Sequence, residues 1–364
     1  MQLDFHYYAT YCAASLAGFS VSDSQIIARS AQFVDCCTRA LLSRVGGPSA
    51  AATTQMQLEL MDARTDPAGL LDITGIWASF HFLPGNLNAV PERGGKKYRR
   101  KYRLICDTNG ELLKGTVELA RGKGPAAAGL AMHVLADTWA HRYFAGTPSL
   151  VINNTNYHFF EILDGPEGEK EIPVRFNHNP ASADDPEKSL YTNTVYQGNE
   201  NSIMNLGHGR AGHLPDYSFA RYRYMPAWDG YREVIKDNPS DYMHAFCQMV
   251  YALQCLNGGD SFETGVYAWE TVKPWREEIN SLLIKRQMDA CEDWKSLGEK
   301  ISGIALPDFD LEQIQVDYME MAEENRENTF LGSFIPAALA QKAMVTGQID
   351  AAEKRHRRMR HDKK

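Results

Sequence analysis

The sequence has no long hydrophobic segment and no recognisable leader. No apolar run approaches the ~20 residues that a membrane-spanning helix needs. The first residues, Met1 to His6, offer neither a basic start nor an apolar stretch before a small-residue cleavage site, so no secretory signal is predicted. We therefore expect a cytoplasmic protein without an integral membrane segment. Export by a dedicated secretion apparatus is the alternative.

Common catalytic motifs are missing as well. The chain contains no G-x-x-x-x-G-K-[ST], no G-x-G-x-x-G after a predicted strand, no G-x-S-x-G and no H-E-x-x-H. Its seven cysteines are an odd number, and none forms a C-x-x-C pair. This usage is typical of a reducing compartment, so neither a disulfide framework nor a thiolate zinc site is predicted.

Positive charge is scarce except at the C-terminal end. The 364 residues carry a net charge of −8, but residues 354–364 hold seven lysines and arginines against one aspartate. The preceding chain is therefore strongly acidic, which argues against a broad nucleic-acid-coating surface. The basic end is interpreted as a flexible tail over 351–364, solvated or in contact with an anionic surface or partner.

Hydrophobic periodicity predicts a mainly α protein with a loop-rich, partly β insertion and additional C-terminal helices. We expect one helical metal-binding domain over 1–350, with a surface excursion at about 161–200. Short strands or loops are expected over 73–107. Helices are predicted over 6–17, 22–42, 124–144, 241–256, 273–288, 311–324 and 334–344.

The sharpest chemical signal is His133-x-x-x-Asp137-x-x-x-His141. Residues four apart lie on one stripe of an α-helix, so the three side chains project to the same side over about 12 Å. The other faces of this helix are apolar, so the stripe should be buried. Burying a carboxylate and two imidazoles is costly unless they are paired or bind a metal. Metal ligation is favoured over a hydrogen-bonded core pair, because imidazole and carboxylate suit zinc or a similar divalent ion.

Further candidate ligands lie upstream. Asp35 has apolar or near-apolar neighbours, and His81 sits in the aromatic frame Phe-His-Phe-Leu-Pro; either could instead be structural. Asp4 and His6 are two residues apart, and in an extended segment both would face one side.

A glycine-punctuated loop downstream holds His208, Arg210, His213 and Asp216 within nine residues. Glycines let its backbone approach closely, although a tight polar loop without a ligand is the alternative. Arg210 is a candidate phosphate clamp because a guanidinium binds phosphate through two parallel hydrogen bonds. A surface role for it is equally compatible with the sequence.

In this order, the histidines and carboxylates resemble those of the zinc-dependent phospholipase C and S1/P1 nuclease superfamily. More closely, the chain is similar to an uncharacterised bacterial protein family. That family's pattern includes D-F-H-Y, A-D-T-x-A-H and G-H-x-x-x-G-x-x-P-D, found here at Asp4–Tyr7, Ala136–His141 and Gly207–Asp216. The resemblance covers roughly residues 1–225 and implies a phospholipase C/P1 nuclease-like helical fold.

Two departures from the superfamily matter. The superfamily uses the amino group of a processed N-terminus as a ligand, whereas this chain starts Met-Gln, so we expect Asp4 to replace that ligand. The final H-x-x-x-E is also missing, and His208 with Asp216 is preferred over His213. The resemblance implies two or three zinc ions or other divalent metals. One would be held by Asp35, His81, His133 and Asp137, a second by His141, His208 and Asp216, and a third by Asp4, His6 and Asp137.

These ligands would make the protein a metal-dependent phosphoric ester hydrolase. Asp137 would bridge two ions, and Asp35 would also orient the attacking water. The acidic chain tilts the expected substrate towards a phospholipid or small phosphodiester, so a phospholipase C-like activity is preferred. An S1/P1-like nuclease is one alternative. A non-enzymatic, metal-stabilised interaction module is the other.

Overall fold

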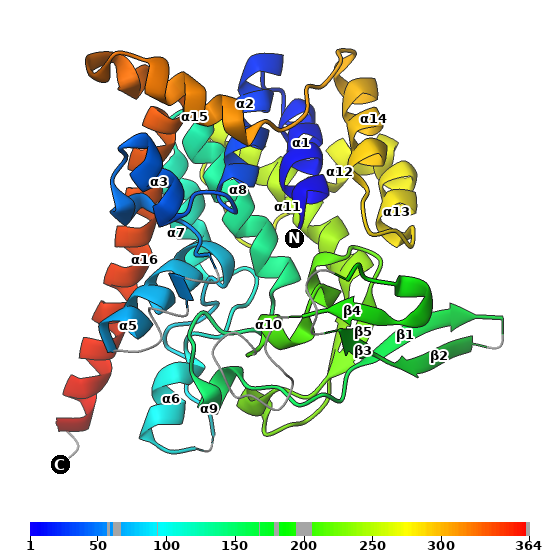
Figure 1. Cartoon of the computed structure of the whole chain (residues 1–364). Coiled ribbons are helices and arrows are strands. Elements are labelled where there is room, and N and C mark those ends of the chain that lie inside the picture. Colours follow the sequence, from blue (N-terminus) through cyan, green and yellow to red (C-terminus); the bar gives the residue numbers. More distant parts are fainter. Residues whose placement is uncertain are drawn as a thin grey trace.

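The computed structural model describes residues 1–56, 59–60, 67–92, 94–166, 168–177, 182–193 and 206–361. The predicted mainly α architecture is confirmed: helices dominate, and short strands form two small sheets (Figure 1). In the labels used here, η marks short 3₁₀ or π segments. The α-helices are α1 Thr10–Leu16, α2 Val21–Phe33, α3 Arg39–Val45, α5 Pro67–Ile76, α6 Lys96–Tyr102, α7 Glu111–Ala120, α8 Pro125–Ala140, α9 Leu150–Asn153, α10 His208–Ala211, α11 Asn238–Gly258, α12 Trp269–Val272, α13 Arg276–Ile284, α14 Cys291–Ser302, α15 Leu311–Glu320 and α16 Phe330–His361. The η segments are η1 Asp4–Ala9, η2 Ser49–Ala51, η3 Trp77–His81, η4 Pro186–Lys188, η6 Leu214–Asp216, η7 Ala227–Asp229, η8 Lys273–Trp275 and η9 Glu323–Asn328.

Helix α8 is the centre of the helical part. It packs against α2, α7, α11 and α16, and its residues are buried from Ala126 to Ala140 (Figure 1). Helices α2 and α8 approach very closely at Gly129, where an added Cβ would lie 2.1 Å from the carbonyl oxygen of Ile27. The alanine-rich sequence of α8 permits such contacts on several faces, so polar side chains on this helix become core residues.

The N-terminal helices differ in detail from those predicted. The first begins as the π-helical turn η1 and continues as α1. The second starts after Ser20, whose side chain accepts a hydrogen bond from the N–H of Asp23, so it begins at Val21, one residue before the predicted start. It ends at Phe33, and α3 begins after the cap Thr38. The intervening turn carries Asp35, which is therefore not inside a helix.

The expected strands or loops over 73–107 are mostly wrong. This region contains α5, the π-helical turn η3 and α6, and among its described residues only the isolated bridge between Pro84 and Cys106 pairs within it. The aromatic residues that favour strands are here buried against neighbouring helices, because tertiary packing overrides a weak local preference. His81 is the last residue of η3.

The β part lies beside the lower end of α8 (Figure 1). One antiparallel sheet has the strand order β2-β1-β5-β6, formed by Gly168–Pro173, Phe160–Gly165, Arg221–Tyr224 and Val234–Asp237. A parallel pair joins β3, Arg175–Asn177, to β4, Leu190–Thr192. The predicted excursion over 161–200 thus contains β1 to β4. Its residues 167, 178–181 and 194–200 lie outside the described residues.

The C-terminal end is helical where a flexible tail is expected. Helix α16 runs from Phe330 to His361 along one side of the molecule (Figure 1). Ala352 is buried, and Glu353 pairs with Arg100 of α6 at 2.5 Å, which explains why the helix continues past residue 350. Residues 362–364 lie outside the described residues. Among the described residues, no helix is both long and apolar enough to cross a bilayer.

Candidate metal centre

The polar stripe of α8 is buried as the sequence predicts. His133, Asp137 and His141 are at most 5% exposed. The carboxylate lies between the two rings, with its Oδ2 3.2 Å from Nε2 of His133 and 3.4 Å from Nδ1 of His141. The i, i+4 spacing therefore brings three potential ligands together on one helix face.

Asp35 and His81 join this stripe from the turn after α2 and from η3. His81 Nδ1 lies 3.3 Å from Oδ2 of Asp137, 3.7 Å from Oδ1 of Asp35 and 3.3 Å from Nε2 of His133. Asp35 Oδ1 is 3.9 Å from His133 Nε2. Asp35, His81 and His133 form a group whose ligand atoms all lie within 4.8 Å of one another, close enough to share an ion.

Backbone carbonyls fix the orientation of three of the imidazoles. His133 Nδ1 donates to the carbonyl of Ala31 at 2.9 Å, and His141 Nδ1 donates to that of His81 at 2.8 Å. His81 Nε2 donates to the carbonyl of Thr53 at 3.0 Å. A carbonyl can only accept, so each of these nitrogens carries a proton, and in the neutral ring the other nitrogen keeps its lone pair. All three lone pairs face the carboxylates, which is the arrangement that outer contacts impose on metal-binding histidines.

His6 joins the cluster from η1. Its ring stacks on that of His133 with centroids 3.9 Å apart, and its Nε2 is 3.2 Å from Oδ1 of Asp137. This short separation lacks hydrogen-bond geometry, and neither ring nitrogen has a hydrogen-bond partner among the described residues. An orphaned imidazole in a fully buried position costs free energy. His6, His133 and Asp137 form a second group able to hold an ion.

The downstream loop supplies a third group. Asp216 Oδ1 lies 3.1 Å from Nε2 of His208 and 3.3 Å from Nε2 of His141. His213 instead donates from Nδ1 to Asp184 at 2.7 Å, so the structure groups His208, and not His213, with Asp216. Gly207, at φ +52°, starts this loop against Asn153, where a Cβ would meet the amide at 2.3 Å.

The amino nitrogen of Met1 lies inside the cluster. It is 3.1 Å from Oδ1 of Asp216, 3.2 Å from Oδ1 of Asp137 and 3.4 Å from Nε2 of His141. It links the group on α8 with the group on the downstream loop. Sequence reasoning assigned this position to Asp4, so the nitrogen of the first residue is the ligand candidate that it missed.

Asp4 does not take the predicted place. Its Oδ1 accepts a hydrogen bond from the N–H of Phe5 at 2.7 Å, and it belongs to none of the three groups. The expectation rested on an extended segment, but residues 4–9 form η1, and residues two apart on a helix point in nearly opposite directions. Burial raises the pKa of Asp4 to about 6.

Arg210 is not exposed as a phosphate clamp. It is 4% exposed, its Nη1 donates to the carbonyl of Thr155 at 2.5 Å and to Asn154 Oδ1 at 3.3 Å, and its guanidinium lies over the ring of Tyr157. The residue thus ties α10 to the 154–157 segment. The sequence could not reveal which way this side chain points.

Burial and mutual charge set the protonation of the cluster. Burial lowers the pKa of His6 and of His141 to about 4, so both rings are neutral at pH 7. Burial alone would raise the pKa of Asp137, but His141 and the Met1 ammonium hold it well below its usual value. The pKa of Asp216 is likewise lowered, by His208 and the same ammonium. For the Met1 amine, burial is outweighed by Asp137 and Asp216, which raise its pKa to about 11.

The donor set fits divalent cations. Ligands about 2.0–2.1 Å from a tetrahedral zinc lie about 3.3 Å apart, close to the separations found here. The neutral rings of His6 and His141 beside ionised Asp137 and Asp216 are in the protonation states that a metal requires. Asp35 and His208 are the most accessible members, with side chains 31% and 21% exposed, so solvent reaches the cluster beside them.

Comparison with known proteins gives one match. A search of curated proteins and a search of solved structures each found no match. The model of a family of unknown function, DUF6765, matches residues 1–349. Because this match spans nearly the whole sequence, the chain belongs to the DUF6765 family.

Proposed function

We propose that this protein is a metal-dependent hydrolase of phosphodiester bonds. The observation that carries the proposal is the orientation of His81, His133 and His141. Each gives one ring N–H to a backbone carbonyl; the other nitrogen of His81 and of His133 faces Asp137, and that of His141 faces Asp216. Outer hydrogen bonds of this kind fix the ring orientation of metal-binding histidines.

Two or three ions, zinc or another divalent metal, would be held by the three groups. Asp35, His81, His133 and Asp137 would hold one, His141, His208, Asp216 and the Met1 amine a second, and His6, His133 and Asp137 a third. When bound, such ions lower the pKa of water and neutralise phosphate charge. Asp137 shares its two oxygens between the groups. The overall arrangement would be that of a phospholipase C/P1 nuclease-like helical fold.

Asp35 would orient the attacking water. Its carboxylate is partly exposed and lies 3.7–3.9 Å from His6, His81 and His133. It can accept a hydrogen bond from a water at the open edge and turn the oxygen lone pair towards a phosphorus atom. Asp137 is fully enclosed, so its role is to hold and orient the neighbouring imidazoles.

Metal analysis and a substrate panel test the proposal. Purified protein should contain two or three divalent ions per chain and should hydrolyse bis-nitrophenyl phosphate. His133→Ala should lose metal and at least a hundredfold in activity, whereas His158→Ala, an exposed histidine outside the cluster, should match the parent protein. A metal-free preparation with full activity would refute the proposal.

The panel also separates the substrates and the competing class. Phosphatidylcholine turnover in preference to single-stranded DNA would support a phospholipase C-like activity, and the reverse would support a nuclease. Metal retention without hydrolysis of any phosphodiester would favour an interaction module whose ions serve folding, since structural zinc sites are usually closed by four protein ligands.

A further inference from the structure

A basic surface forms where α6 meets the end of α16. Lys96, Lys97 and Arg100 of α6 are exposed, and so are Lys354 and Arg355 of α16. Arg358, one turn further on, is exposed as well. The ion pair of Arg100 with Glu353 joins the two helices, so these cations form one surface although they are distant in sequence (Figure 1).

Acidic side chains are outnumbered here, in a chain whose net charge is −8. Glu353 is paired with Arg100, and Asp229, close to α6, is paired with Arg232. Glu92 and Asp350, close in sequence to α6 and to the end of α16, are exposed acids. Burial, with a smaller contribution from the nearby Arg100, lowers the pKa of Lys101.

Apolar side chains are exposed on the same end of the molecule. Helix α6 packs against α9, whose Leu150 and Val151 are 44% and 37% exposed. Val90, 66% exposed, lines a hollow of about 800 Å³ with Tyr98 and Tyr102 of α6. Cations surrounding exposed aliphatic side chains are typical of surfaces that enter the headgroup layer of a bilayer.

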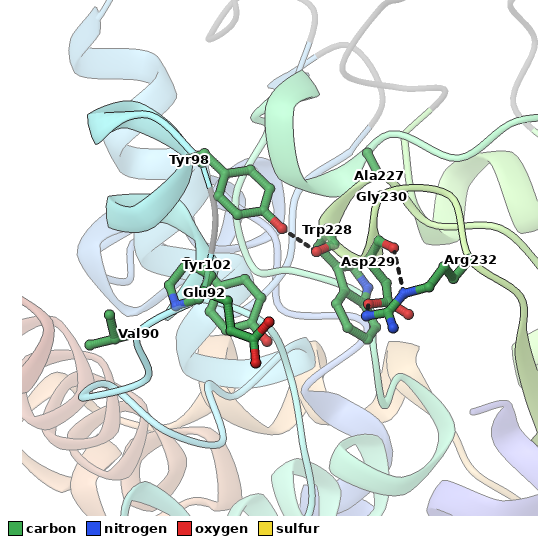
Figure 2. A pocket seen from close by; sticks show the side chains of 11 residues that line it. Val90, Glu92, Tyr98, Tyr102, Ala227, Trp228, Asp229, Gly230 and Arg232 are labelled. Carbon is green, nitrogen blue, oxygen red and sulfur yellow. Dashed lines mark hydrogen bonds and ion pairs between the residues drawn. The ribbon is translucent and has the colours of Figure 1, made fainter.

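The aromatic hollow does not favour a nucleic acid. Figure 2 shows the hydroxyl of Tyr98 directed at the backbone of Trp228, to whose carbonyl it donates. The Tyr102 and Trp228 rings meet edge to face at 6.4 Å, so the faces on which bases would stack are partly used. Aliphatic Val90 and Leu150 gain free energy from acyl chains and little from a nucleic-acid backbone.

We propose that the surface formed by α6, α9 and the end of α16 binds anionic lipid membranes. Its cations contact the headgroups while Val90, Leu150 and Val151 enter the acyl boundary. The binding requires no hydrolysis, so it is separate from the proposed phosphodiesterase activity. Each cation near an anionic bilayer contributes about 1 kcal/mol, or about fivefold in partitioning.

Vesicle flotation of the full chain tests this binding. The protein should float with phosphatidylcholine vesicles that contain about one-third phosphatidylserine, and not with phosphatidylcholine alone. Lys96→Gln with Lys97→Gln should lower partitioning about 25-fold, and Lys354→Gln with Arg355→Gln should do the same. The matched control, Lys273→Gln with Lys300→Gln on η8 and α14, removes the same charge elsewhere and should change it less than twofold.

Two further measurements decide between lipid and other ligands. Val90→Ser with Leu150→Ser should weaken vesicle binding at least tenfold, with an unchanged circular dichroism spectrum. No effect of this pair, or binding to single-stranded DNA without binding to vesicles, would overturn the proposal. Loss of vesicle binding after metals are removed by a chelator would also overturn the proposal, since the metal cluster would then explain the binding to vesicles.

Discussion

The amino nitrogen of Met1 and Oδ1 of Asp216 lie 3.1 Å apart in the interior of the molecule. This contact closes the cluster between η1 and the downstream loop, and it places a positive charge between Asp137 and Asp216 when no ion is bound. On metal binding the same nitrogen can lose its proton and become a ligand, because a buried amine surrounded by imidazoles and an ion no longer needs to neutralise two carboxylates.

A chain extended before Met1 should therefore lose function. An added residue turns the amine into an amide, removes the charge and must fit where Met1 is only 7% exposed. We expect a short N-terminal extension to lower metal content by about one ion per chain and to reduce the melting temperature. The measurement is elemental analysis with calorimetry. The same extension placed after Lys364 is the control, and equal metal content in both proteins would show that the free amine is not a ligand.

Asp137→Asn should strongly destabilise the metal-free protein. The substitution leaves the Met1 ammonium with one carboxylate fewer in a site that is closed to water. Breaking a buried ion pair on one side costs about 3–5 kcal/mol. Urea unfolding of the chelated protein measures the loss. Asp35→Asn serves as the comparison, because its carboxylate is 31% exposed and should cost less than about 1 kcal/mol. Equal losses in the two variants would contradict this account.

The stability of the metal-free protein should fall on both sides of neutrality. His6 and His141 have their pKa lowered to about 4, so between pH 6.5 and 4 the unfolded chain binds protons that the folded chain does not. Stability then decreases as pH falls, by up to about 1.4 kcal/mol per pH unit for each histidine. The pKa of Met1 is raised to about 11, so its contribution is lost as pH rises from 8 to 11. Urea unfolding across pH 4–11 checks this, and a His6→Gln variant should flatten the acid side.

The helical stripe and the order of the ligands could be predicted because they depend on local spacing. Four-residue intervals place His133, Asp137 and His141 on one face in any α-helix. The apolar composition of that helix then indicates that the face is buried. Asp35, His81 and His208 also reach the cluster as predicted, since their types and surroundings already set them apart from exposed polar residues. Their role as metal ligands stays a prediction.

The predictions that are wrong concern side chains and helix ends whose positions depend on backbone geometry or on contacts between residues distant in sequence. Asp4 was placed by assuming an extended segment, and the π-helical turn turns it away. The burial of Arg210 under the 154–157 segment depends on a carbonyl of Thr155 that no local pattern identifies. Helix α16 continues beyond residue 350 because Ala352 is buried and Glu353 pairs with Arg100. The strongly basic local sequence does not indicate these contacts.

His208 and His213 should behave differently when replaced. His208 Nε2 faces Asp216 and the cluster, whereas His213 Nδ1 is held by Asp184, which also accepts from Thr192 and Tyr217. His208→Ala should therefore remove about one ion per chain and most of the thermal stabilisation that metal provides, because a lost ligand weakens binding directly.

His213→Ala is the matched variant, taken from the same loop. It should keep the full metal content and lose about 1–2 kcal/mol of stability, since Asp184 retains two of its donors. Elemental analysis and melting curves with and without chelator measure both effects. Loss of an ion from His213→Ala together with full occupancy in His208→Ala would reverse the assignment, and would require the loop over Gly207–Asp216 to rearrange when metal binds.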